Sequence, residues 1–449
     1  MRKTITQHDI LARLLQQGED APAMDCGQRG ICRKCRVKLL SGLWLADGKP
    51  VKAPAEVLSC RTRLLGDAGE VEFTPYDAKL SVSADWILDK AMPVIPEAVI
   101  GIDIGTTTLA AVKLKNGQIV SRAAAANPQA AFGADVISRI AAAEKHLVQL
   151  STLIHNAVDA LLDELGMDDV TCIAIAGNTV MTSLFHQVDP TPIGTAPFQP
   201  VQRVFPEIIR RQVPLYTVPC ISGFLGGDLT AGINEIALAE NEMLVDIGTN
   251  CEIIFRTPRG MIGTSAAAGP AFEQYGMQAQ NGAIGHLFSF DDFTVIGDTA
   301  PKGLCGSALI DFLAVARKNG LLDERGLYTA ECDFPFAPSA EDVAELLKAK
   351  AAVFAGIRSL ENFAGSKASR IWLAGGFARH LDLANAVFIG MLPEREFRVV
   401  GNSALAGACR LAADPSLMGC LKNHAAAPQE ISLNTLPGFE KIFIEALSL

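Results

Sequence analysis

The chain lacks the features of a membrane protein and of a nucleic-acid-binding protein. No apolar stretch reaches the ~18 residues that a membrane-spanning helix needs. No run of basic residues stands out and the net charge is −10, so binding to nucleic acid is not expected. The opening residues MRKTITQHDI contain no apolar signal core. We therefore expect a cytoplasmic protein without a membrane or nucleic-acid partner.

Two common site motifs are also missing. The chain has no G-x4-G-K-[ST] motif, which excludes a P-loop protein, and no second C-x2-C pair, which zinc ribbons usually bring. What it does have is an ordinary soluble composition, 49% hydrophobic and 20% charged. Its 449 residues are enough for about three domains of roughly 150 residues each.

The eleven cysteines fall into two groups. An odd number of cysteines in a large chain without an export signal argues against a disulfide framework. Seven are scattered singly, and we expect them to serve as small buried hydrophobic residues. These seven are Cys172, Cys220, Cys251, Cys305, Cys332, Cys409 and Cys420.

The other four cysteines are spaced C-x5-C-x2-C, with 24 residues before the last one. The plant-type ferredoxin pattern is C-x4-C-x2-C…C, which is one residue shorter in the first gap. Gly27 and Gly30 let the loop turn its N–H groups inward, which favours a negatively charged sulfur cluster. We interpret the group as the ligands of a 2Fe–2S cluster, with zinc or no metal as the alternatives. The candidate ligands are Cys26, Cys32, Cys35 and Cys60.

The first cysteine gap resembles that of adrenodoxin-type ferredoxins, which implies a ferredoxin-like α+β domain over residues 1–75. Residues 8–18 are predicted to form a helix and residues 36–42 a strand. Only MRKTITQ precedes the helix, so one strand stands where such domains usually open with a hairpin. Residues 76–97 contain two prolines and no clear long element, which predicts an interdomain linker.

A strand–turn–strand motif then occurs twice. Asp103-Ile-Gly-Thr-Thr107 and Asp246-Ile-Gly-Thr-Asn250 lie 143 residues apart (246 − 103). A repeat at this distance predicts two duplicated lobes, over residues 98–240 and 241–449. The Asn-Gly pair at 116–117 predicts a tight hairpin after the second strand of the first lobe.

The residue types of this repeat suit a phosphate site. Glycine lets the backbone approach a phosphate, Thr and Asn supply short donors, and a carboxylate can hold Mg²⁺ through water. Two such turns facing each other would clamp a triphosphate, whereas the plain alternative is two ordinary hairpins with polar turns. The candidate phosphate-binding residues are Gly105, Thr106, Thr107, Gly248, Thr249 and Asn250.

A third element is an apolar strand that ends in Gly375, Gly376 and Phe377. Its paired glycines would admit the flat face of an adenosine or allow a helix to pack closely. The order of these elements resembles the superfamily of acetate kinase, sugar kinases, Hsp70 and actin. That resemblance implies an α/β, two-lobed ATPase fold with duplicated βββαβα units behind the ferredoxin-like domain.

Further stretches narrow the resemblance. Together with the cysteine group they are similar to the reductive activators of corrinoid proteins, in order along the chain. The stretches are AGNTVM (176–181), PIGTAPFQP (192–200), GFLGGD (223–228), AAAGPAFE (266–273), GAIGH (282–286), GLCGSALID (303–311) and ISLNTLPGFEKIF (431–443).

The resemblance implies a function and a set of roles. The four cysteines would hold the 2Fe–2S cluster, and the protein would pass one electron to cobalt(II), giving the cobalt(I) that methyl transfer requires. For a one-electron transfer, each 59 mV of unfavourable potential difference lowers the equilibrium constant tenfold. Binding and hydrolysis of ATP would offset this cost. Asp103 and Asp246 would be the catalytic residues that bind Mg²⁺ or position water, and Gly375, Gly376 and Phe377 would line the adenosine site.

The resemblance also implies partners. They are a corrinoid protein of a methyltransferase system, an external low-potential electron donor and, as one option, a second copy in a homodimer. The chain has no D-x-H-x-x-G, so the corrinoid should sit on a separate protein. The alternative function is an ATP-binding electron carrier or redox sensor that does not reduce a corrinoid. Glu273 and Cys305 fit either a site role or a structural one.

Overall fold

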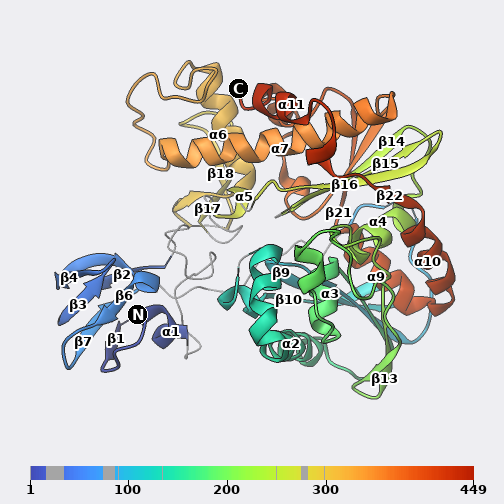
Figure 1. The fold of residues 1–449 in the computed structure, drawn as a ribbon, viewed down its shortest axis with the longest axis horizontal. Coiled ribbons are helices and arrows are strands. Elements are labelled where there is room, and N and C mark those ends of the chain that lie inside the picture. Colours follow the sequence, from blue (N-terminus) through green and yellow to red (C-terminus); the bar gives the residue numbers. More distant parts are fainter. Residues whose placement is uncertain are drawn as a thin grey trace.

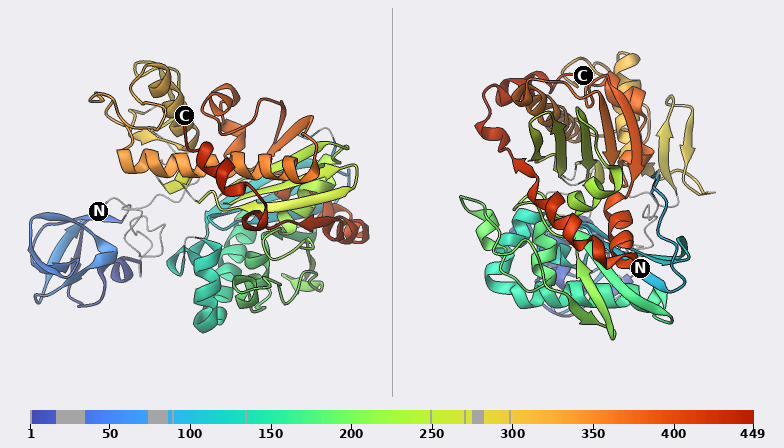
Figure 2. Two further views of the ribbon diagram at one scale, coloured as in Figure 1. Left: turned by 45° about the horizontal axis from the view of Figure 1, so that its top comes forward. Right: turned by 90° about the vertical axis from the view of Figure 1, so that its right-hand side faces the viewer.

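The computed structural model divides into a small N-terminal domain and two larger lobes (Figure 1). In Figures 1 and 2 the N-terminal domain, in blue, lies to one side of the lobes. No helix among the described residues is long and apolar enough to cross a membrane. The structure describes residues 2–16, 35–73, 86–88, 90–133, 135–248, 250–269, 271–274, 282–297 and 299–449.

The N-terminal domain contains two small sheets and, among its described residues, one helix that packs against the second sheet. Its first sheet has the strand order β1-β7-β2-β5 and its second the order β4-β3-β6. The predicted helix and strand are both present, as α1 and β2 with shorter bounds, and a single strand, β1, precedes α1. The elements are β1 Arg2–Ile5, α1 Leu11–Gln16, β2 Arg36–Leu39, β3 Leu43–Ala46, β4 Lys49–Lys52, β5 Ala55–Leu58, β6 Thr62–Leu64 and β7 Gly69–Glu72.

The first lobe is built on a six-stranded sheet of order β10-β9-β8-β11-β13-β12. Strands β8, β9 and β10 form an antiparallel meander, and β11 and β13 continue the sheet parallel to β8. Asn116 and Gly117 both have positive φ in the β9–β10 turn, as the Asn-Gly pair predicts. The elements are β8 Ala98–Ile104, β9 Thr108–Lys115, β10 Gln118–Ala126, α2 Val136–Leu165, β11 Val170–Gly177, α3 Thr179–Phe185, β12 Ile208–Arg210, β13 Val213–Thr217 and α4 Gly227–Ile236.

The second lobe repeats this plan in a sheet of order β21-β20-β14-β15-β16-β22. Again three antiparallel strands, β14 to β16, are followed by strands parallel to the first of them, β20 and β21. The duplicated α/β architecture that the repeat predicts is therefore confirmed. The sheet strands are β14 Glu242–Ile247, β15 Cys251–Thr257, β16 Gly260–Ala266, β20 Arg370–Ala374, β21 Glu396–Gly401 and β22 Pro428–Glu430.

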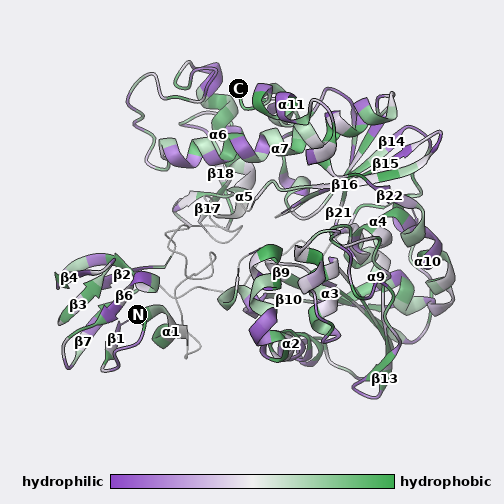
Figure 3. Cartoon of the chain, in the orientation of Figure 1, coloured by the Kyte–Doolittle hydropathy of each residue, from purple (hydrophilic) through white to green (hydrophobic). Residues whose placement is uncertain are grey.

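A small sheet, β18-β17-β19, and several helices complete this lobe. Hydrophilic and hydrophobic residues alternate along α7, whose buried side faces the core (Figure 3). The strands are β17 Ala283–Leu287, β18 Phe293–Val295 and β19 Gly303–Leu304. The helices of the C-terminal part are α5 Ala271–Gln274, α6 Gly306–Lys318, α7 Ala340–Ala364, α8 Leu383–Phe388, α9 Ser403–Ala413, α10 Met418–Ala426 and α11 Phe439–Glu445.

A helix from the sequence range predicted for the second lobe packs on the first lobe. Helix α9 falls within 241–449 but packs on β8, β11 and α4 of the first lobe (Figures 1 and 2). Small residues allow this close packing, because a Cβ on Gly101 would lie 2.4 Å from Cys409 Sγ and one on Gly407 2.6 Å from Ala231 Cβ. A range drawn from a sequence repeat cannot show that a later helix returns to the first lobe.

The predicted linker is also partly attached to the ATPase lobes. Trp86 forms an antiparallel bridge with Gly401, at the end of β21. Arg410 donates to the carbonyl of Ala91 at 2.9 Å and forms a buried ion pair with Glu235 at 2.6 Å. The C-terminal half of the range 76–97 is thus held against α4 and α9, whereas residues 74–85 lie outside the described part of the chain.

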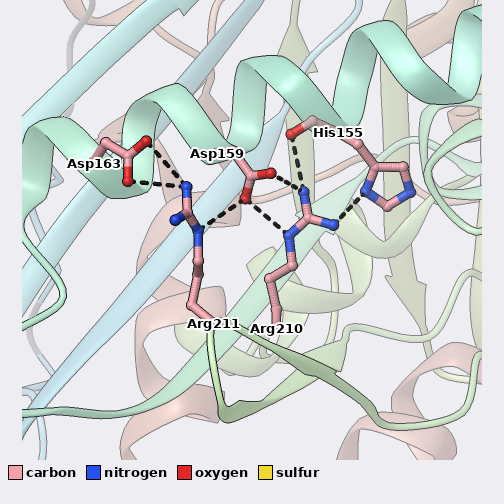
Figure 4. Close-up of polar contacts among 5 residues, drawn as sticks. All are labelled: His155, Asp159, Asp163, Arg210 and Arg211. Carbon is pink, nitrogen blue, oxygen red and sulfur yellow. Dashed lines mark hydrogen bonds and ion pairs between the residues drawn. The ribbon is translucent and has the colours of Figure 1, made fainter.

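Ion pairs fasten the β12–β13 turn to α2, on the side of the first lobe (Figure 4). Arg210 donates to both carboxylate oxygens of Asp159, at 3.0 and 2.6 Å, and its Nη1 lies 3.0 Å from His155 Nδ1. Arg211 pairs with Asp163 at 2.9 Å. These half-exposed contacts are worth little individually, and together they fasten the C-terminal half of α2.

Candidate functional site

The two repeated turns line one cavity of about 540 Å³. Turn 1, Asp103–Thr107, joins β8 to β9, and turn 2, Asp246–Asn250, joins β14 to β15. The strand end at Gly375–Phe377 closes a further side of the cavity. Every nucleotide-site residue predicted from the sequence lines this cavity except Thr249, which lies outside the described residues. The lining set is Asp103, Gly105, Thr106, Thr107, Asp246, Gly248, Asn250, Gly375, Gly376 and Phe377.

Four carboxyl groups meet in the cavity, of which the sequence analysis found two. Asp228 and Glu252 join Asp103 and Asp246. Burial, followed by the charges of Asp228 and Asp103, raises the pKa of Asp246 to about 8. Burial raises the pKa of Asp103 to about 7, although the hydrogen bond from Asn402 opposes the shift. Burial also raises the pKa of Asp228 to about 6 and that of Glu252 well above its ordinary value.

These carboxyl groups do not form a ready-made metal cage. Among the described residues, no group of three or more His, Cys, Asp or Glu side chains has the geometry to hold a metal ion. Magnesium is commonly bound by one or two carboxylates, with waters and substrate phosphates completing the octahedron. The cavity therefore fits a cation that arrives with a phosphate-bearing ligand.

Two asparagines that sequence reasoning missed tie helix ends to turn 1. Asn178 caps α3 with its side-chain oxygen and donates its amide to Thr106 Oγ1 at 2.9 Å. Asn402 caps α9 in the same way and donates to Asp103 Oδ2 at 2.9 Å. Asn178 lies in the AGNTVM stretch and Asp228 in GFLGGD, so motif matching marks both segments without assigning a role to either residue.

Gly375 lets two backbone segments approach closely. Its φ is +94°, and a Cβ there would lie 2.7 Å from the carbonyl oxygen of Ile247 and 2.8 Å from Asp246 Oδ1. Phe377 stacks on Phe272 at 4.8 Å between ring centroids, and both rings line the cavity. The glycine thus packs against turn 2, and the adjacent aromatic pair offers a flat apolar wall.

The sequence leaves the roles of Cys305 and Glu273 open, and the structure describes the side chain of only the first. Cys305 is buried, lines the cavity and lies 3.1 Å from Ser307 Oγ. The side chain of Glu273 lies outside the described part of the chain, as does Pro270 before it.

The structure describes two of the four candidate cluster cysteines. Cys26 and Cys32 lie outside the described residues. Cys35 and Cys60 are both buried, and their sulfur atoms lie 3.3 Å apart. A disulfide would bring them to about 2.05 Å, whereas two thiolates on one tetrahedral metal with bonds of about 2.3 Å would lie about 3.8 Å apart. The pair therefore fits two ligands of a single metal ion with a small adjustment.

The fold and the two sites define a class, a two-lobed ATPase fold that carries an iron–sulfur domain. Residues 4–65 match the 2Fe-2S iron-sulfur cluster binding domain. Residues 98–241 match the RACo middle region, and residues 240–338 and 336–449 match the C-terminal domain of RACo, the ASKHA domain. The chain belongs to the RACo family.

Individual relatives agree with this placement. A curated protein from Eubacterium limosum, "Corrinoid activation enzyme RamQ", is 28% identical over 373 residues, which are 69% of this chain and 63% of the relative. The match therefore spans slightly less than two thirds of that relative's length. A solved structure described as a reductive activator for corrinoid, iron–sulfur protein has 24% identity and a TM-score of 0.71. It aligns over 98% of this chain and 95% of its own, and it supports the fold.

Proposed function

We propose that this protein uses ATP to drive a one-electron reduction of a corrinoid protein. The observation that carries the proposal is that the cavity between the two D-I-G-T turns and the buried Cys35–Cys60 pair occur in one chain. The name of the curated relative and the description of the solved structure support the same activity. The overall change reduces cobalt(II) to cobalt(I) with one electron, while ATP and water give ADP and phosphate.

The chain's own residues divide this task. Cys35 and Cys60, together with Cys26 and Cys32, would hold the 2Fe–2S cluster, which stores and releases one electron when bound. Turn 1 and turn 2 belong to opposite lobes, so a nucleotide that contacts both would favour a closed arrangement of the lobes. The energy of this closure is available to bias the docking of a partner.

The carboxyl groups would act at the phosphate end of the nucleotide. Asp246 and Asp103 would orient Mg²⁺ waters or the hydrolytic water, and a bound cation would shift both groups towards their ionised forms. Gly375, Gly376 and Phe377 would take the adenosine. An external low-potential donor must return the electron after each reduction. We also propose the domain boundaries: residue 75 ends the ferredoxin-like domain, residue 97 ends the linker, and residue 240 ends the first lobe.

Two measurements test the proposal in sequence. Anaerobically purified protein should show the visible absorbance of an iron–sulfur cluster, and the absorbance should be lost in Cys60→Ser. A colourless protein that contains zinc would contradict the electron-transfer role. ATP should then be required for conversion of a cobalt(II) corrinoid protein to cobalt(I), followed by its absorbance. Reduction at the same rate without ATP, or in Asp246→Ala, would instead indicate an electron carrier that merely binds nucleotide.

A further inference from the structure

A buried arginine lies directly behind turn 1. Arg139, in the first turns of α2, has no exposed surface. Its Nη2 donates to the carbonyl of Thr106 at 2.6 Å, its Nε to the carbonyl of Gly133 at 2.9 Å, and its Nη1 to Gln129 Oε1 at 3.4 Å. Nη1 also lies 3.0 Å from Met181 Sδ. The guanidinium is thus held by neutral partners and points at the backbone of the turn.

Each hydrogen bond that Arg139 makes among the described residues goes to a neutral group. Burial lowers the pKa of the guanidinium to about 9, with only the charge of Asp135 opposing the shift. A buried charge without an ionic partner is costly, and native proteins normally pair such charges. An anion that binds on the far side of the turn would supply the missing charge.

The backbone of turn 1 is oriented for such an anion. The carbonyl groups of its last three residues are all held from behind. Asn127 donates to Gly105 O at 2.9 Å and to Thr107 O at 2.8 Å, and Arg139 donates to Thr106 O. In a planar trans peptide the N–H points opposite to the C=O. The N–H groups of Thr106 and Thr107 therefore point away from Arg139 and Asn127, on the side where both residues line the cavity.

We propose that Arg139 is the buried counter-charge for the phosphate groups of a nucleotide at turn 1, and that it acts through the Thr106 peptide rather than by contact. Carbonyls turned to the cation and N–H groups turned to the anion align the peptide dipoles between the two charges. In a low-dielectric site the attraction extends across the turn. Arg139 is then a positioning residue, and the inference rests on the proposed binding of ATP in this cavity.

The test is equilibrium binding of ATP, ADP and AMP to the full-length protein with the variants Arg139→Gln and Arg139→Lys. A charge effect should scale with the ligand's charge, so Arg139→Gln should weaken ATP binding about tenfold, ADP less and AMP least. Lysine keeps the charge and should restore much of the difference between ATP and AMP. Arg210→Gln, an arginine held at the other end of α2, is the matched control and should bind all three as the unchanged protein does.

A second variant keeps the arginine in place. Gln129→Glu would place a carboxylate beside the Arg139 Nη1 and neutralise the guanidinium without removing it. It should reduce the preference for ATP over AMP. Because it also loses the bond that Gln129 Nε2 donates to the Leu150 carbonyl at 2.9 Å, Gln129→Met, which loses the same bond without adding a charge, is its control. An equal loss of affinity for the three nucleotides, or no loss in any variant, would overturn the inference. Failure of the unchanged protein to bind ATP would instead refute the proposed function, which separates the two outcomes.

Discussion

The two D-I-G-T turns have nearly the same sequence and opposite surroundings. Turn 1 is backed by the buried cation of Arg139, and Asn402 donates to its carboxylate. Both turns close through their glycine, with Gly105 N–H donating to Thr108 O at 3.0 Å and Gly248 N–H to Asn250 O at 2.9 Å. Turn 2 differs in that the carboxyl group of Glu252 follows it in the same cavity. The first turn therefore favours an anion, and the second favours a cation or a proton.

This difference shows that duplication supplies the backbone geometry, while the charge beside each turn comes from residues that the two hairpins do not share. The strand–turn–strand frame is set by residues within each hairpin. At turn 1 the cation of Arg139 comes from α2 and the neutral donor Asn402 from the start of α9, both from elsewhere in the chain, whereas Glu252 at turn 2 lies in β15 of the same hairpin. The pKa of Asp246, at about 8, is accordingly higher than that of Asp103, at about 7.

The largest expected effect is on ATP hydrolysis, when the aspartate of turn 1 or of turn 2 is replaced by asparagine. Asp246→Asn should lower ATP hydrolysis by about 100-fold or more, because it removes the group placed to orient a cation or water. Asp103→Asn should have a smaller effect, since Asn402 already donates to one oxygen of that carboxylate. Steady-state hydrolysis in the presence of a cobalt(II) corrinoid protein measures both. Equal losses would mean that the two turns share one role.

The sequence predicts the frame of this site well, for a physical reason. Residues Asp103–Thr107 and Asp246–Asn250 each lie in one hairpin, so their spacing in the chain fixes their spacing in space. Gly375–Phe377 follows a strand that any parallel sheet would bring to the same edge. All the described members of these three segments except Ile104 line one cavity.

The rest of the site depends on contacts that spacing does not encode. Arg139 is 33 positions from Thr106, and Asn402 is 299 positions from Asp103. Arg139 looks like an ordinary charged residue of an amphipathic helix, and only its burial shows otherwise. The return of α9 to the first lobe likewise depends on the small residues that face Gly101 and Ala231.

The stability of the nucleotide-free protein should fall as pH rises from about 4 to 8. The folded protein keeps protons on Asp228, Asp103 and Asp246 up to pH values of about 6, 7 and 8, whereas the unfolded chain releases them near pH 3.9. The unfolded state thus binds fewer protons in this range, and the free energy of unfolding decreases with pH. Each pKa unit corresponds to about 1.4 kcal/mol.

Asp228→Asn should flatten this dependence, because the Asp228 charge raises the pKa of both other groups. Chemical denaturation at several pH values measures the slope. Asp163→Asn, a substitution in the surface ion pair with Arg211, is the control and should leave the slope unchanged. A stability that rises towards pH 8 in the unchanged protein would show that the carboxyl groups are ionised without a cation.

The equivalent glycines of the two turns should tolerate alanine differently. A Cβ on Gly105 would lie 2.5 Å from the carbonyl oxygen of Thr108, whereas the nearest atom to a Cβ on Gly248 is Asn250 O at 3.7 Å. Gly105→Ala should therefore lower the free energy of unfolding by about 1–3 kcal/mol, and Gly248→Ala should change it by less than about 0.5 kcal/mol. Similar thermal unfolding of the two variants would remove this steric distinction between the turns.

A modest effect is expected at the helix cap that supports turn 1. Asn402→Ala should lower the free energy of unfolding by about 1 kcal/mol, the ordinary value for a lost N-cap. Ser339→Ala is a matched control, because Ser339 caps α7 with its side chain and does not line the cavity. The two variants should unfold alike at pH 5, where Asp103 is protonated in the folded protein. Above pH 7 only Asn402→Ala should lose further stability, because the ionised Asp103 then lacks its donor. The same loss at both pH values would show that the Asn402 amide does not discriminate between the two states of Asp103, and that turn 1 differs from turn 2 through Arg139 alone.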